Sequence, residues 1–146
     1  MAERTARAAW KGNLKDGAGT VEPGSGSFKG RYSFQSRFES GPGTNPEELI
    51  GAAHAACFSM ALAGHLAQAG YSPEDIQTTA TVSIEKRHDG FSITRIELDT
   101  QATVPDIDDG TFQEQAEIAK RTCPVSKALA ATEIRLKARL TSAQAA

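Results

Sequence analysis

The sequence predicts an α+β fold in which antiparallel sheets surround one long, buried helix. Three observations carry this prediction. Strand-like segments separated by glycine-rich turns occupy residues 5–40. An apolar helix follows over residues 46–69, and the later elements do not show the βαβ alternation of a parallel sheet. The length of 146 residues suits one domain, predicted to cover residues 1–146.

The N-terminal segment is expected to form three strands. Tyr32, Phe34 and Phe38 alternate with polar residues, which is the period of a half-buried strand. The glycines before them are spaced almost like those of a dinucleotide-binding loop, but no helix signal follows. A hairpin loop is therefore expected there.

The central helix is the strongest structural signal. Asn45 and Glu48 form a capping box, Pro46 suits the first helical position, and Gly70 ends the helix. At 1.5 Å per residue the helix is about 36 Å long. Its side chains are apolar nearly all round, so it must be buried. One domain of this size is too small to surround it, and the sequence therefore predicts a partner subunit.

The second half is expected to contain a hairpin, two helices and a last strand. Asp89–Gly90 is a favoured type I′ turn. Thr111 and Glu114 make a capping box, and Pro124 interrupts the helix that follows it. The expected elements are strands at 76–87 and 91–104, helices at 111–121 and 124–131, and a strand at 133–140.

Charge and composition exclude several classes of protein. Sixteen Lys and Arg oppose 18 Asp and Glu, giving a net charge of −2, which argues against a nucleic-acid or membrane-surface protein. No uninterrupted apolar run is long enough for a membrane span, and the N-terminus lacks the apolar core of a secretory signal. A cytoplasmic protein is expected.

The two cysteines, Cys57 and Cys123, are too few for a secreted disulfide scaffold. They are either reactive thiols or small core residues. Burial alone would leave Cys57 inert, and it becomes a nucleophile only beside a cation. His54 shares its helix face, but no Cys-x-x-Cys or His-x-x-His cluster accompanies it, so no metal is expected. His54 and His65 are expected to be hydrogen-bonded core residues.

Residues 41–60, GPGTNPEELIGAAHAACFSM, and 122–126, TCPVS, resemble the OsmC/Ohr family of osmotically inducible and organic hydroperoxide resistance proteins. The resemblance extends over essentially the whole chain, and RFE at 37–39 is closer to the OsmC branch. It implies an OsmC-like fold, an intertwined homodimer, and a cysteine-based peroxidase that uses no metal, haem, flavin or other cofactor.

The same resemblance implies four site residues: a peroxidatic Cys57, a resolving Cys123, a thiolate-stabilising Arg37, and Glu47 to orient that arginine. A fixed guanidinium would stabilise the thiolate and the charge that develops on the peroxide oxygen. Attack gives a sulfenic acid, and the second thiol converts it to a disulfide. The implied partners are a hydroperoxide, a small dithiol reductant of the lipoyl type, and a second copy of the chain.

The spacing of Glu47 and Cys57 bears on that dimer. Ten residues of one helix correspond to about 15 Å along its axis, so an arginine held by Glu47 would have difficulty reaching Cys57 of the same chain. Two antiparallel helices related by a two-fold axis near Ala52 would bring Glu47 of one chain beside Cys57 of the other. The sequence therefore predicts a shared site.

Two other functions fit the same residues: a non-enzymatic thiol redox sensor, and a small-molecule-binding dimer whose cysteines fill the core. Without the resemblance, Arg37 is a solvated strand residue, and Glu47 merely stabilises the helix dipole. Phe58 and Met60, the apolar neighbours of Cys57, favour organic hydroperoxides as substrates, with hydrogen peroxide as a second one.

Overall fold

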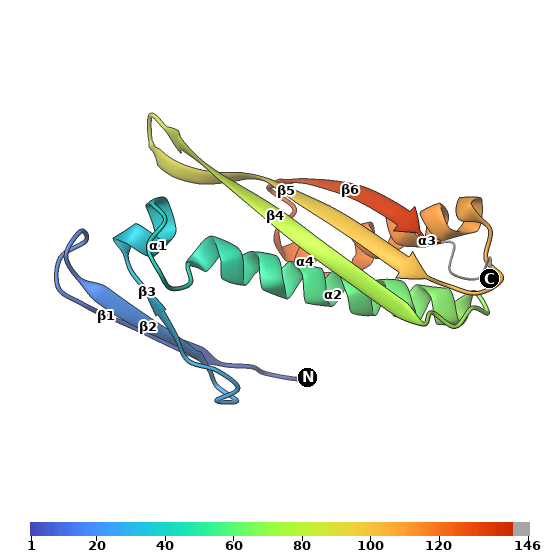
Figure 1. Ribbon diagram of the computed structural model, residues 1–146, viewed down its shortest axis with the longest axis horizontal. Coiled ribbons are helices and arrows are strands. Elements are labelled where there is room, and N and C mark those ends of the chain that lie inside the picture. Colours follow the sequence, from blue (N-terminus) through green and yellow to red (C-terminus); the bar gives the residue numbers. More distant parts are fainter. Residues whose placement is uncertain (142–146) are drawn as a thin grey trace. The chain divides into compact units, whose positions relative to one another are not determined.

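The computed structural model describes residues 1–141, which form two three-stranded sheets and four helices (Figure 1). The contacts divide the chain into two compact units, Met1–Leu49 and Ile50–Ala146, and the boundary falls within the longest helix. Each unit has its own sheet. The single domain expected over residues 1–146 stays a prediction.

The first unit contains an antiparallel sheet in the order β1 (Ala6–Lys11), β2 (Ala18–Pro23) and β3 (Gly30–Tyr32). The three predicted strands are therefore confirmed. The rings of Trp10 and Tyr32 pack against each other with centroids 5.4 Å apart. This contact joins the two outer strands of the sheet.

The continuation of the third strand through Phe38 is wrong, because Phe34–Phe38 is a short helix, α1. The hydroxyl of Ser33 accepts a hydrogen bond from the Ser36 N–H (3.1 Å), and that of Ser36 accepts one from the Ser33 N–H (2.8 Å). This reciprocal capping box starts a helix where the alternation of apolar residues predicted a strand. Arg37 consequently lies on a helix.

The predicted central helix is α2 (Pro46–Gln68). Asn45 Oδ1 accepts the N–H of Glu48 (2.7 Å), but the Glu48 carboxylate accepts the Thr44 hydroxyl (2.7 Å) instead of closing the box. Gly70, with φ of 95°, follows its C-terminal end. By length and apolar composition α2 meets the criteria for a membrane-spanning helix. The core helix of a soluble protein meets the same criteria.

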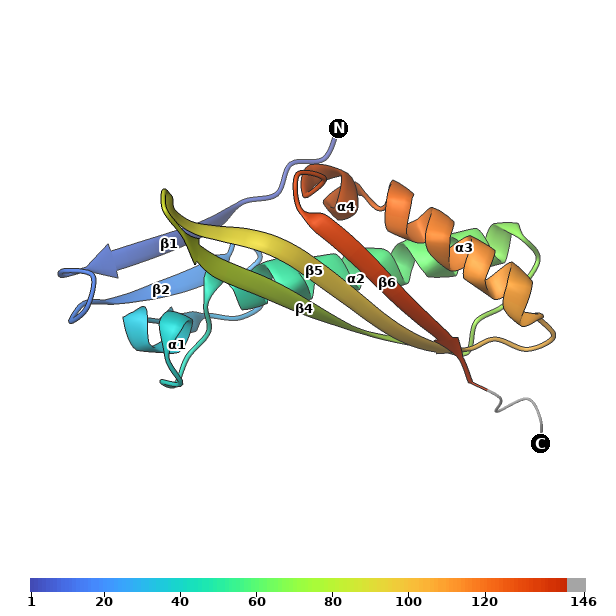
Figure 2. The ribbon, with the colours of Figure 1, turned by 90° about the horizontal axis from the view of Figure 1, so that it is seen from above.

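The sheet of the second unit is mixed. β4 (Asp75–Arg87) pairs antiparallel with β5 (Gly90–Thr103), and β6 (Glu133–Leu140) pairs parallel with β5. The parallel pairing differs from the all-antiparallel expectation, because the chain crosses back over the sheet through α3 (Asp109–Thr122) and α4 (Pro124–Ala128). Figures 1 and 2 show α2 and α3 on the same face of this sheet.

The hairpin between β4 and β5 is confirmed, but its predicted turn type is wrong. Arg87 pairs with Gly90, so His88 and Asp89 form the turn. A type I′ turn needs positive φ at both central residues. Among residues 1–141, Asp106 is the only residue other than glycine with positive φ.

The helix boundaries after β5 also differ from the prediction. Asp108, rather than Thr111, is the N-cap of α3: its carboxylate accepts the N–H (3.0 Å) and the hydroxyl (2.7 Å) of Thr111. α3 therefore begins at Asp109. Pro124 separates α3 from α4 as predicted, although α4 already ends at Ala128.

The core of the second unit lies between the sheet and the two helices α2 and α3. Its largest fully buried apolar members are Phe58, Leu62, Leu66, Ile96, Leu98, Val104 and Phe112. The opposite side of α2 is exposed and apolar; it includes Ala52, Ala56, Met60 and Gly64. A single chain therefore covers one side of α2, in agreement with the prediction that one domain is too small to surround this helix.

Candidate active site

Cys57 and Cys123 come together in the second unit, where their sulfur atoms lie 2.9 Å apart and share a hydrogen bond. Cys57 is half-buried in the middle of α2, and Cys123 is fully buried. Cys123 is both the C-cap of α3 and the N-cap of α4, where its sulfur accepts a hydrogen bond from the Ser126 N–H at 3.4 Å. The helix break at Pro124 thus places the second thiol against the first.

The surroundings affect the two thiols in opposite directions. Burial raises the pKa of Cys57, and the hydrogen bond that it shares with Cys123 raises it further. Burial also acts to raise the pKa of Cys123, but its bonds with Cys57, Ser126 and the Val125 N–H outweigh burial and lower it. Among the described residues, no cation contributes to the pKa of Cys57. A Cys57 thiolate therefore needs a positive charge from elsewhere.

Arg37 and Glu47 form a second pair, in the first unit. Arg37 Nη2 donates to Glu47 Oε1 at 2.7 Å, and Nε donates to the two carboxylate oxygens at 3.1 and 3.2 Å. The side chains are 37% and 8% exposed, respectively. A forked contact with a nearly buried carboxylate fixes the plane of the guanidinium. The structure thus brings the four predicted residues together as two pairs, one in each unit.

A cavity of about 270 Å³ opens beside Arg37 within the first unit. It is lined by Trp10, Leu14, Tyr32, Ser33, Phe34, Arg37 and Phe38. An aromatic wall with one guanidinium suits an apolar molecule that has a polar end. The sequence suggested Phe58 and Met60 for this purpose, but Phe58 lies in the core with 0% exposure and Met60 is 78% exposed on α2.

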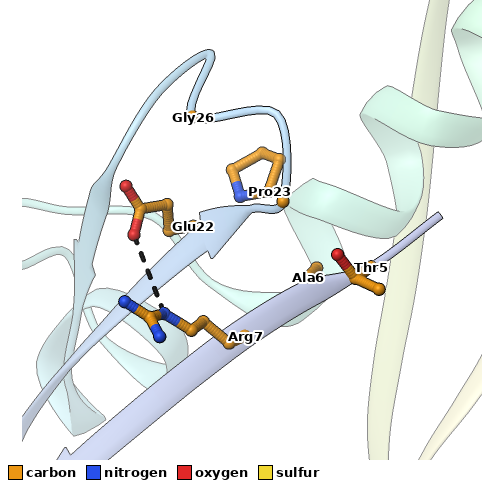
Figure 3. Close-up of a pocket in the computed structure, with 7 residues that line it drawn as sticks. Thr5, Ala6, Arg7, Glu22, Pro23 and Gly26 are labelled. Atoms are coloured by element: carbon orange, nitrogen blue, oxygen red, sulfur yellow. Dashed lines mark ion pairs between the residues drawn. The ribbon is translucent and has the colours of Figure 1, made fainter.

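Another cavity of the first unit, about 370 Å³ in volume, lies between the start of β1 and the end of β2 (Figure 3). Arg7 and Glu22 form an ion pair across it at 4.0 Å. None of its lining residues is a thiol or histidine, so it offers no redox chemistry. Among residues 1–141, no three His, Cys, Asp or Glu side chains are grouped to hold a metal ion.

The expected role of His54 as a hydrogen-bonded core residue is confirmed: it is 0% exposed, and Nε2 lies 2.7 Å from Ser126 Oγ. Burial lowers the pKa of His54. His65 also bonds to a hydroxyl, that of Thr122 at 3.0 Å, but it is only half-buried. Sequence reasoning missed Ser126, although its place three residues after the N-cap Cys123 is a signal for contact with that side chain.

A family model described as OsmC-like protein matches residues 39–139. The chain belongs to the OsmC family. Within it, the peroxiredoxin OsmC of Escherichia coli is 52% identical over 137 residues, which is 93% of this chain and 95% of that protein. The organic hydroperoxide resistance protein of Xanthomonas axonopodis pv. citri is 34% identical over 60% of this chain and 61% of its own length.

Solved structures of OsmC relatives share the fold. The organic hydroperoxide resistance protein OsmC of Legionella pneumophila is 25% identical with a TM-score of 0.69, covering 97% of this chain and 99% of that one. The organic hydroperoxide resistance protein OhrB of Bacillus subtilis is 26% identical with a TM-score of 0.67, covering 94% and 98%. The OsmC-like α+β fold predicted from the sequence is thereby confirmed.

We expect one equivalent of cumene hydroperoxide to join Cys57 and Cys123 in an intramolecular disulfide, because the two sulfurs are already 2.9 Å apart. Mass spectrometry of the intact chain should show the loss of two hydrogen atoms. Cys123→Ser is the control, and its Cys57 should instead pass from the sulfenic to the sulfinic acid. An unchanged mass in the wild type, or disulfides only between chains, would contradict the prediction.

Proposed function

We propose that this protein is a cysteine-based peroxidase that reduces organic hydroperoxides, with Cys57 as the peroxidatic thiol and Cys123 as the resolving thiol. The 2.9 Å contact between the two sulfurs carries the proposal. The 52% identity to a protein named a peroxiredoxin supports it. The half-buried Cys57 is the thiol that a peroxide reaches first, and the buried Cys123 is held against it.

The reaction requires only thiol chemistry. The Cys57 thiolate attacks one peroxide oxygen, the O–O bond breaks, and the alcohol leaves after taking up a proton. Cys57 is then a sulfenic acid, and attack by Cys123 forms the disulfide and releases water. A small external dithiol, such as a lipoyl group, restores both thiols by exchange.

Arg37 supplies the cation that Cys57 lacks. Its ion pair with Glu47 occupies Nε and Nη2, so that Nη1 remains to donate to a thiolate or to a peroxide oxygen. Because no described residue lowers the pKa of Cys57 through a positive charge, such a donor would convert an inert thiol into a nucleophile. Glu47 keeps the guanidinium plane fixed while the charge develops.

The active protein is a homodimer, and each site takes Arg37 and Glu47 from the partner subunit. Ten residues of α2 separate Glu47 from Cys57, about 15 Å along the helix. The exposed side of α2 is apolar and, apart from Met60, built from small residues, so it permits close approach of a second α2. An antiparallel arrangement about Ala52 covers this side and completes two equivalent sites.

The aromatic cavity beside Arg37 receives the apolar part of an organic hydroperoxide, with the peroxide group at the guanidinium. Hydrogen peroxide would be a second substrate that leaves this cavity unused. The proposed setting is the cytoplasm, in defence against oxidative and osmotic stress.

Consumption of cumene hydroperoxide with excess dithiothreitol tests the proposed function. An enzyme consumes many equivalents of peroxide for each chain, because the reductant returns both thiols. Cys57→Ser is the control and should consume none. A single equivalent would instead indicate a redox sensor, and no consumption by the wild type would indicate a binding protein with structural cysteines.

Arg37→Ala should raise the pKa of Cys57 and slow its oxidation by peroxide, since a lost charge-assisted contact costs roughly 2–4 kcal/mol at the transition state. Thiolate absorbance against pH and stopped-flow oxidation measure the two effects. Arg31→Ala, at an exposed arginine of β3, is the matched control and should behave like the wild type. An unshifted titration together with a normal rate would show that another residue is the cation.

Mixing two inactive variants tests whether the site is shared. In a heterodimer of Cys57→Ser and Glu47→Ala chains, a shared arrangement puts both lesions in one site and leaves the other intact, so activity should return. Co-expression with two different tags avoids slow subunit exchange. If each chain builds its own site, every site keeps a lesion and activity stays lost.

A further inference from the structure

A buried row of polar side chains runs from α2 to the resolving thiol. His54 Nε2 lies 2.7 Å from Ser126 Oγ. The Ser126 N–H donates to the Cys123 sulfur at 3.4 Å, and the backbone and the hydroxyl of Ser126 both act to lower the pKa of that thiol. His54 and Cys123 are 0% exposed and Ser126 is 4% exposed, so water does not replace these contacts. The peroxidase reaction proposed above assigns no role to His54 or Ser126.

The other ring nitrogen of His54 sets the direction of the hydrogen bonds. Within the described residues, His54 Nδ1 is buried and has no hydrogen-bond partner. A proton on Nδ1 would be a buried donor without an acceptor, which proteins tolerate less often than an acceptor without a donor. A neutral ring with its proton on Nε2 avoids this and donates to Ser126 Oγ. The hydrogen of the Ser126 hydroxyl is then free to turn toward the Cys123 sulfur, which the N–H of the same residue already contacts.

We propose that His54 and Ser126 form a donor chain that stabilises the thiolate of Cys123 and thereby speeds its attack on the Cys57 sulfenic acid. This inference rests on the proposed function. Ser126 touches the reacting sulfur and is a catalytic residue. His54 acts through Ser126 and is a positioning residue, which holds the serine oxygen so that its hydrogen faces the sulfur.

The step balances without a further reagent, because the hydroperoxide has already oxidised Cys57. The Cys123 thiolate attacks the Cys57 sulfur; the S–S bond forms and the S–O bond breaks. The hydroxide that leaves takes up one proton and becomes water, which accounts for the proton that Cys123 lost on ionisation. Donors directed at Cys123 increase the fraction of thiolate available for this attack.

The other titratable groups around Cys123 do not provide the same contact. Cys57 faces it from α2 at 2.9 Å. His65, also on α2, contacts Thr122, whose hydroxyl donates to the Ile118 carbonyl at 2.8 Å and not to the sulfur. The nearby cations of α3 and α4 are the partly buried Lys120, which pairs with Glu117, and the exposed Arg121 and Lys127.

A titration that needs no peroxide tests the donor chain first. In the Cys57→Ser background, thiolate absorbance against pH reports Cys123 alone. Ser126→Ala and His54→Leu should each move the Cys123 titration to higher pH, whereas His54→Gln, which keeps an N–H donor without a titrating ring, should leave it near its original position. His65→Leu is the matched control and should leave it unchanged. Identical titrations in Ser126→Ala and its parent would overturn the proposal.

Single-turnover oxidation then measures the consequence. After one equivalent of cumene hydroperoxide, trapping of the sulfenic acid at successive times gives the rate of disulfide closure. At neutral pH, Ser126→Ala and His54→Leu should close roughly tenfold more slowly, which corresponds to one lost hydrogen bond to a charged group. The deficit should disappear at a pH where Cys123 is fully ionised, and His54→Gln should close within about twofold of the wild type.

The outcomes separate the two proposals. If the wild type forms no sulfenic acid, the proposed function fails, while the titration still decides the donor chain. A deficit of equal size at every pH would mean that the substitutions only disturb packing, and it would overturn the donor chain. Disulfide closure that is equally slow in His54→Gln and His54→Leu would also overturn the donor chain. If His54→Leu does not fold, Ser126→Ala removes a single oxygen atom and carries both tests.

Discussion

The contact between Cys57 and Cys123 is the constraint on which the proposed chemistry of the second unit depends. It joins the middle of one helix to a break between two others, so α2, α3 and α4 must all be held in place. Phe58 and Leu62, which follow Cys57 on α2, fix that helix in the core, and Phe112 fixes α3 in the same core. The proline after Cys123 turns the chain so that its sulfur can cap α4 and still reach Cys57.

That position has an electrostatic consequence. A thiol buried against a second thiol becomes harder to ionise, and the pKa of Cys57 rises accordingly. A nucleophilic thiol in such a place requires a fixed cation, and the guanidinium of Arg37, in the other unit, is fixed against a nearly buried carboxylate. The exposed apolar side of α2 and the ten-residue spacing of Glu47 and Cys57 both favour a dimer that unites the two pairs.

Features with a strong local cause could be predicted from the sequence. The limits of α2 follow from Asn45, Pro46 and Gly70, and the helix break follows from Pro124. The strand expected through Phe38 was wrong because two serines close a capping box that outweighs the alternation of apolar residues. Composition and length showed that α2 is apolar and too long for one domain to surround, but not which of its sides a single chain leaves exposed.

In the candidate site, too, only features with a local cause in the sequence could be predicted. The four candidate residues could be named because the motifs that contain them are continuous in the chain. Ser126 was missed since its importance depends on His54, 72 positions away in the sequence, which only the packing of α2 against α4 brings within 2.7 Å. Hydrogen bonds between distant elements leave no periodic signal in the sequence. The aromatic cavity beside Arg37 could not be predicted either, because its lining residues come from separate segments of the chain.

The most direct test of the central claim is a crystal structure of the reduced protein, in which the distance from Cys57 Sγ to the nearest guanidinium is measured. We expect Arg37 of the partner subunit within about 4–6 Å of that sulfur, the range in which an opposite charge favours ionisation, with Glu47 of the partner subunit still bound to it. A Cys57 whose nearest cation belongs to its own chain, or which has none within that range, would contradict the account.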